Sequence, residues 1–146
     1  MLKRLLLLTI VMCAFKTINA QKDQIEHIWY NEEKTSKIQI YKGDDGKYYG
    51  KIVWLQTPND KKGKPRTDEK NPNPKYQIQP LLNLVILKDF TKTNDVYENG
   101  TVYDPNSGKT YCGKLTYSET EKEIKLRGYI CSFSLFGRSS TWTLAD

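Results

Sequence analysis

The sequence has too few histidines and cysteines for most kinds of catalytic or metal site. Its 146 residues include one histidine, His27, and three cysteines. A nucleophilic triad needs a base that titrates near neutral pH, and His27 is not accompanied by a Gly-x-Ser-x-Gly turn. A four-ligand zinc site would need carboxylates in addition, and no Cys-x-x-Cys pair occurs. We therefore expect no catalytic residues, no metal site and no cofactor.

Long hydrophobic runs are also missing, and the one apolar run lies at the N-terminus. A basic pair precedes residues 5–15, which are apolar, and a small residue precedes the charged segment that follows. This run is about half of the roughly 20 residues that a membrane span requires, so residues 1–20 are typical of a secretory signal peptide. We expect a secreted or periplasmic protein without a membrane span after cleavage, with one domain over residues 21–146. Lipid attachment at Cys13 is the alternative, but Met12 is bulky where such processing sites need a small residue.

The charge excess is small once this segment is removed. It contains three of the 23 basic residues and no acid, which leaves 20 basic against 17 acidic residues and a net charge of +3. A nucleic-acid binder normally concentrates a stronger positive field on one face. We therefore expect no nucleic acid as partner. We also expect the protein to be a monomer.

Aromatic residues are abundant and indicate an all-β fold. Ten Tyr, three Trp and four Phe stand against two Met, and aromatic side chains pack well on pleated sheets. Short alternating runs separated by turn residues predict hairpins. The predicted strands are residues 36–42, 47–55, 81–90, 96–103, 109–117, 123–132 and 137–143. Their number and spacing favour a closed antiparallel barrel or a sandwich.

Side-chain alternation assigns residues to faces of these strands. Tyr48, Gly50, Ile52 and Trp54 should share one face of their strand. Asn99-Gly100 is a strong hairpin signal and predicts a turn inside residues 96–103. The hairpin of residues 109–132 should bury one apolar face, made of Tyr111, Gly113, Leu115, Tyr117, Ile124, Leu126, Gly128 and Ile130.

Residues 56–80 contain five of the six prolines and six Lys or Arg residues. A central strand does not tolerate this composition, and a loop of this length in a small domain is usually functional or disordered. The tract Asp68 to Pro74 places Asn and Asp beside rigid prolines, which favours an ordered crossing. We interpret the loop as a lid, or as a surface for an envelope protein.

Two pairs of residues test the barrel directly. Pairing Leu115 with Leu126 sets Cys112 opposite Tyr129, so that Cys112 and Cys131 are diagonal neighbours. A disulfide between them would then need a bulge that shifts the register by two, and two free thiols are the alternative. In a closed barrel, Trp29 near the first strand and Trp142 in the last should lie on neighbouring strands, because closure removes both sheet edges.

Five ordered motifs carry a family resemblance. They are Tyr49-Gly50-Lys51-Ile52-Val53-Trp54-Leu55, Asp68-x-x-Asn71-Pro72-x-Pro74, Tyr103-Asp104-Pro105-x-Ser107-Gly108-Lys109-x-Tyr111, Leu126-Arg127-Gly128-Tyr129 and Phe136-Gly137-Arg138-x-x-Thr141-Trp142. Together they resemble the bacterial secreted family called domain of unknown function twenty-one forty-seven, over nearly the whole chain after residue 20. The resemblance implies a single lipocalin-like, calycin-like antiparallel β-barrel of about eight strands and no established activity.

The leading functional hypothesis is an exported, non-enzymatic binding module that holds a small apolar or amphipathic ligand in or at the barrel. The candidate ligand-binding residues are Trp29, Tyr49, Trp54, Asn71, Tyr103, Arg127 and Trp142. The alternative is an envelope-associated structural or protein-interaction module that uses the Pro/Lys-rich loop 56–80. A third class, an enzyme, would need Arg127 and an acid such as Asp104 to meet in one cleft.

Overall fold

The structure is a computed structural model that describes residues 21–145. The signal peptide predicted for residues 1–20, with Cys13, lies outside the described residues and stays a prediction. Among residues 21–145, no helix is long and apolar enough to cross a membrane.

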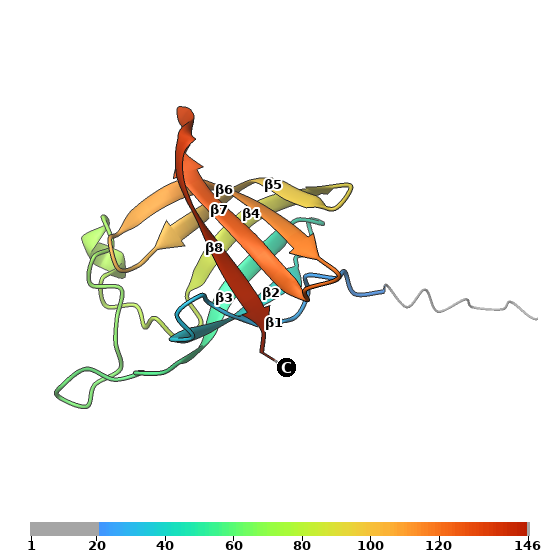
Figure 1. The fold of residues 1–146 in the computed structure, drawn as a ribbon. Helices are drawn as coiled ribbons and strands as arrows, with labels where there is room; N and C mark the ends of the chain where they lie inside the picture. The colour runs from blue at the N-terminus through green and yellow to red at the C-terminus, as the bar shows by residue number, and fades with distance from the viewer. Residues whose placement is uncertain (1–20, 146) are drawn as a thin grey trace, which may run out of the picture.

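Eight antiparallel strands form a closed barrel (Figure 1). Each strand pairs with its neighbour in the sequence, and the last pairs with the first. The strands are β1 (Ile28–Tyr30), β2 (Ser36–Lys42), β3 (Tyr48–Leu55), β4 (Val85–Thr93), β5 (Val96–Asp104), β6 (Lys109–Ser118), β7 (Glu123–Ile130) and β8 (Phe133–Leu144), with a 3-10 helix, η1 (Pro74–Tyr76), between β3 and β4. The predicted all-β, eight-stranded barrel is confirmed.

The barrel closes through pairing of the first and last strands, which contain Trp29 and Trp142, as predicted. Trp29 in β1 pairs with Leu144 in β8, next to Trp142 in the same strand. Both tryptophans are buried in the core, and the indole nitrogen of Trp29 donates to the carbonyl of Ile25 at 2.9 Å. Among residues 21–145, closure leaves the barrel without a free edge strand.

The core consists of the inward side chains of all eight strands and the short N-terminal segment before β1. Ile25, Trp29, Phe90, Tyr97, Leu115 and Ile124 are almost fully buried. Burying a large apolar side chain stabilises a fold by about 1.5 to 3 kcal/mol. The barrel interior is therefore packed over much of its length.

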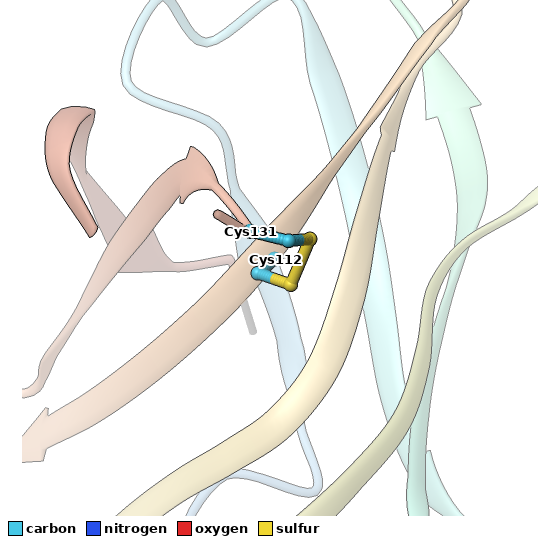
Figure 2. Close-up of a disulfide and its surroundings, with 2 residues drawn as sticks. All are labelled: Cys112 and Cys131. Atoms are coloured by element: carbon cyan, nitrogen blue, oxygen red, sulfur yellow. A yellow bond between two sulfur atoms is a disulfide. The ribbon is translucent and has the colours of Figure 1, made fainter. Parts of the chain in front are cut away.

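A disulfide joins Cys112 in β6 to Cys131 (Figure 2), with the two Cα atoms 5.1 Å apart. The predicted register is present, since Cys112 pairs with Tyr129. The expectation that the bridge needs a two-residue register shift is wrong. Cys131 lies after the end of β7, in the turn before β8, so the diagonal spacing of a regular ladder does not apply to it.

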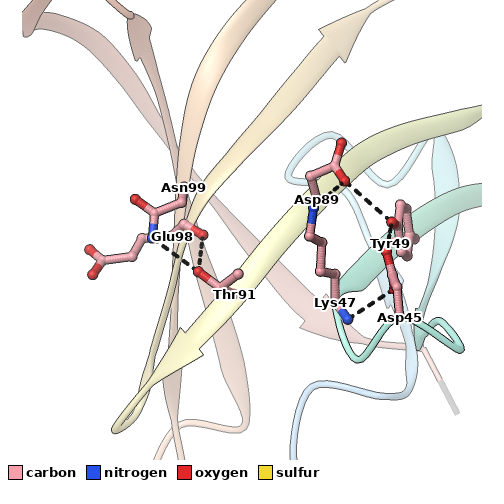
Figure 3. Close-up of polar contacts among 7 residues, drawn as sticks. All are labelled: Asp45, Lys47, Tyr49, Asp89, Thr91, Glu98 and Asn99. Atoms are coloured by element: carbon pink, nitrogen blue, oxygen red, sulfur yellow. Dashed lines mark hydrogen bonds and ion pairs between the residues drawn. The ribbon is translucent and has the colours of Figure 1, made fainter.

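The turn predicted at Asn99-Gly100 is also wrong. Both residues lie inside β5 at a register irregularity, and the β4–β5 hairpin turns at Asn94-Asp95. Asn99 has a φ of 63°, and its side-chain amide donates to Thr91 at 3.0 Å (Figure 3). A Cβ at Gly100 would lie 2.3 Å from the Phe90 ring. The Asn-Gly pair therefore serves a bulge that accommodates a core aromatic ring, not a turn.

A second bulge changes the face on which Trp54 lies. Lys37 pairs with Trp54 and the next β2 residue, Ile38, pairs with Ile52, which leaves Val53 as the extra residue. Beyond the bulge the alternation is inverted, so Trp54 is on the outside, 38% exposed, and packs edge-on against Tyr30. The predicted shared face of Ile52 and Trp54 is wrong for this reason.

Most predicted strands differ from the observed ones at their ends, and the last strand begins at Phe133 rather than at residue 137. Leu81 and Leu84 are buried, but β4 begins only at Val85, after Asn83 with a φ of 68°. The predicted apolar face of the β6–β7 hairpin holds for Gly113, Leu115, Ile124 and Leu126, which are buried. It fails for Ile130, which is 49% exposed. There the β7–β8 hairpin extends beyond the barrel body (Figure 1).

Candidate binding site

A cavity of about 550 Å³ opens at one end of the barrel, where β3 and β5 end and where β2 begins. We call this end the mouth. The apolar part of its wall comes from five strands, with Ile38, Ile52, Ile86, Val102 and Trp142. Polar side chains, among them Asn31, Thr35 and Ser140, line the rest. The apolar residues line the cavity because strand alternation directs every second side chain inward.

The rim of the mouth carries charge. Arg66 from loop 56–80 and Arg138 from β8 both line the cavity, and both are exposed. Two acids also line the cavity. The Glu33 carboxylate accepts from the Asn31 side-chain amide at 2.8 Å, and the Asp104 carboxylate accepts from the backbone amide of Asn106 at 3.0 Å and from the Ser107 hydroxyl at 2.6 Å. For the two arginines, the described residues supply no side-chain ion pair or hydrogen bond. The mouth therefore combines an apolar wall with two guanidinium groups that are not engaged by carboxylates.

Loop 56–80 borders the mouth and is fixed by a buried carboxylate. Asp68 is fully buried, accepts from the Tyr103 hydroxyl at 2.7 Å and from the Asn71 amide at 2.7 Å. Burial and the bond to Asp68 raise the pKa of Tyr103 to about 12, so this phenol stays a donor. A Cβ at Gly108 would lie 1.9 Å from the carbonyl oxygen of Lys70, which shows how closely the turn after β5 packs against the loop. The ordered crossing predicted for this tract is confirmed.

The opposite end of the barrel is closed by the segment before β1. The carboxylate of Asp23 accepts from the hydroxyls of Tyr48, at 2.8 Å, and Tyr97, and from the Lys92 ammonium at 2.9 Å. Burial alone would raise the pKa of Asp23, but the hydrogen bonds from Tyr97, Lys92 and Tyr48 outweigh it and lower the pKa below its ordinary value of 3.8. Burial and the bond to Asp23 raise the pKa of both tyrosines. Polar groups at this end are thus satisfied by one another.

The seven predicted ligand residues fall into four places. Trp142 and Tyr103 line the cavity, and Trp29 is buried in the core without lining it. The side-chain amide of Asn71 donates to Asp68, as the Tyr103 hydroxyl does, and so fixes loop 56–80.

The other three predicted residues lie outside the barrel. Trp54 packs on the outer face, as described above. Tyr49 is also on the outer face, where its hydroxyl donates to Asp45 at 2.6 Å (Figure 3). The guanidinium of Arg127 donates to the carbonyl of Ser134 at 2.8 Å. Arg127 does not line the pockets that contain Asp104, so the pair that an enzyme hypothesis required is not brought together.

Sequence reasoning missed Arg66, Arg138 and the apolar wall. Arg138 could have been found, because it is four residues before the inward Trp142 and so shares its face. Arg66 gives no such signal, since a loop residue has no alternation.

Among residues 21–145, no three His, Cys, Asp or Glu side chains cluster in a way that could hold a metal ion.

The fold defines the class of protein as a lipocalin-like barrel. A protein from Helicobacter pylori, HP1028, which is described as belonging to the lipocalin family, superposes with a TM-score of 0.69 and 22% sequence identity, over 84% of this chain and 83% of the other. The sequence model of the family described as "Uncharacterized protein conserved in bacteria (DUF2147)" matches residues 27–144, and the chain belongs to this family. No curated protein matches it.

Proposed function

We propose that this protein is an exported, non-enzymatic binding module that holds a small amphipathic molecule in the mouth of its barrel. The apolar part of the ligand lies against Ile52, Ile86 and Trp142, and an acidic head group lies at the rim near Arg66 and Arg138. The observation that carries the proposal is the cavity of about 550 Å³ with an apolar wall and unengaged guanidinium groups at its opening.

Size and chemistry both support a small ligand. Ligand cavities usually measure roughly 300 to 1,000 Å³ and combine apolar walls with few polar groups. A guanidinium binds carboxylate or phosphate oxygens through paired hydrogen bonds. An amphiphile with an acidic head therefore fits better than a neutral one.

The test compares laurate with 1-dodecanol, which have the same chain length and differ in the head group. Trp142 lines the cavity, so its fluorescence should change when either probe binds, and the melting temperature should rise by mass action. Arg66→Gln and Arg138→Gln should weaken laurate binding but leave dodecanol binding unchanged. Lys61→Gln, in the same loop as Arg66, is the matched control and should change neither.

A second pair of variants locates the ligand. Ser36 is at the start of β2 and lines the cavity, while Gln39 lies in the same strand on the other face. Ser36→Phe should fill the cavity and abolish binding of both probes, whereas Gln39→Phe should have no effect. Binding that survives Ser36→Phe would place the ligand elsewhere and contradict the proposal.

One observation favours a second candidate, an envelope protein partner on loop 56–80. Lys61, Lys62 and Lys64 are exposed at the loop tip, away from the Asp68 anchor. Changing these three lysines to Gln should abolish a pull-down of such a partner and spare laurate binding. Deleting residues 61–70 is a poorer test because it also removes Asp68 and releases the loop from the barrel.

A further inference from the structure

The hairpin between β7 and β8 presents apolar side chains to solvent. We define residues 130–136 as the apolar arm. Leu135 is 90% exposed, Phe136 66%, Phe133 63% and Ile130 49%. Soluble proteins rarely leave a contiguous group of this kind uncovered, and such groups mark interaction surfaces.

The arm is held out from the barrel rather than folded back on it (Figure 1). The Cys112–Cys131 disulfide ties the turn of this hairpin to β6. The Arg127 guanidinium donates across the hairpin to the Ser134 carbonyl at 2.8 Å, and the rings of Phe133 and Phe136 meet edge-on at 6.4 Å. These contacts keep the tip in an extended shape and leave its side chains free to contact something else.

The charges behind the tip are basic. Residues 124–145 contain Lys125, Arg127 and Arg138 and no Asp or Glu. Arg127 lies opposite Lys114 of β6 in the register. The nearest acid along the groove beneath the arm is Asp104, whose carboxylate is bonded to its own turn. An apolar tip with positively charged residues behind it complements an anionic lipid surface. The apolar side chains enter the hydrocarbon boundary while arginine and lysine contact the head groups.

We propose that the apolar arm inserts into the surface of a bilayer that contains anionic lipids. The rings of Phe133 and Phe136 meet although the two residues are three apart, because the β7–β8 register shifts between Tyr129 and Ile130. An apolar cluster at a projecting tip, with basic side chains behind it, suits insertion at the head-group boundary of a bilayer. A groove of about 440 Å³, lined by Tyr111, Ile130 and Phe136, runs under the arm and shares Arg138 and Asp104 with the mouth cavity. Insertion therefore brings the mouth to the lipid surface. The proposal rests on exposure and charge and does not depend on a ligand in the cavity.

The test is co-sedimentation with lipid vesicles, using the chain from residue 21 on, which contains the whole closed barrel. Phosphatidylcholine vesicles are compared with vesicles in which phosphatidylglycerol replaces half of the lipid. The chain should bind the mixed vesicles, and added salt should weaken binding. Leu135→Ser and Phe136→Ser should each reduce partitioning by about tenfold or more, the fold-change expected for losing one buried apolar side chain.

The matched control is Ile78→Ser, because Ile78 is 82% exposed but lies in loop 56–80. It should leave vesicle binding unchanged. Equal binding by the wild type and Leu135→Ser, or an equal loss in Ile78→Ser, overturns the proposal. The proposal is also overturned if the wild type forms a dimer that Leu135→Ser dissociates and does not bind mixed vesicles. That result would identify a second copy of the chain as the partner of the arm. Leu135→Ser changes an almost fully exposed side chain, so its circular dichroism spectrum should match the wild type and exclude misfolding as the cause.

Discussion

The two ends of the barrel are built by the same eight strands and differ in how their inner side chains are used. At the closed end, Asp23 engages Tyr48, Tyr97 and Lys92, and the two tyrosine rings meet edge-on at 5.0 Å. At the mouth, apolar walls surround a cavity and the rim arginines are not engaged by carboxylates. The difference shows that binding capacity here is decided by the residues at strand ends and by the segments that cover them, not by the fold itself.

The largest loss of stability should come from truncating Trp29, which does not line the mouth cavity. Trp29→Ala should lower the free energy of unfolding by about 3 to 5 kcal/mol, the range for removing a fully buried large aromatic. Trp142→Ala should cost less, because Trp142 already borders the mouth cavity. Urea unfolding of both variants checks this. An equal loss would mean that the mouth is packed as tightly as the closed end.

Next in size is the loss of the carboxylate that closes the far end. Asp23→Ala should cost about 1 to 3 kcal/mol, because the buried hydroxyls of Tyr48 and Tyr97 lose their acceptor. Hydrogen exchange should rise in the segment before β1, while loop 56–80 should keep its protection. Uniform exchange over both ends would contradict a local role for Asp23.

The same carboxylate predicts a pH dependence. The pKa of Asp23 is lower in the folded chain than its ordinary value of 3.8, so its contribution to stability is fully present above that value. The contribution is lost as the pH falls through the folded pKa. The difference in unfolding free energy between the wild type and Asp23→Asn should stay constant from about pH 7 to 5 and shrink below about pH 4. A difference that grows on acidification would show that the sign is wrong.

The last comparison is between two inward residues of β2, and one of them should have the smallest effect. Ile40 is buried toward the closed end, and Ile40→Phe should overpack the core and cost about 1 to 3 kcal/mol. Ser36 borders the mouth cavity, which has room for a ring, so Ser36→Phe should change stability by less than about 0.5 kcal/mol. Thermal unfolding decides between them. A large loss in Ser36→Phe would show that the cavity does not accept the added volume.

Much of the fold could be predicted from local pattern. Alternation and turn residues gave the β2–β3 and β6–β7 hairpins, and the pairing of Leu115 with Leu126 is observed. Closure near Trp29 and Trp142 followed from the need to cover sheet edges. These features depend on residues close in sequence or on a general property of sheets.

The errors have a common physical origin in tertiary packing. Asn99-Gly100 has the residues of a turn, but the Phe90 ring from the neighbouring strand requires a glycine at that place. The inversion at Trp54 depends on one extra residue in β3, which a two-residue alternation cannot reveal. The candidate site shows the same contrast between local pattern and tertiary packing. Trp142 and Tyr103 were predicted from composition and motifs, whereas Arg66 reaches the rim because Asp68 anchors its loop.

The most direct test of the central claim is an NMR titration of the ¹⁵N-labelled chain with laurate. The account predicts that amide shifts concentrate at the mouth, near Ile52, Arg138 and Trp142. Amides beside Asp23 and Tyr97 at the closed end should remain unperturbed. Shifts at the closed end, shifts confined to the outer face around Tyr49 and Trp54, or no shifts at all would contradict a ligand site in the barrel mouth.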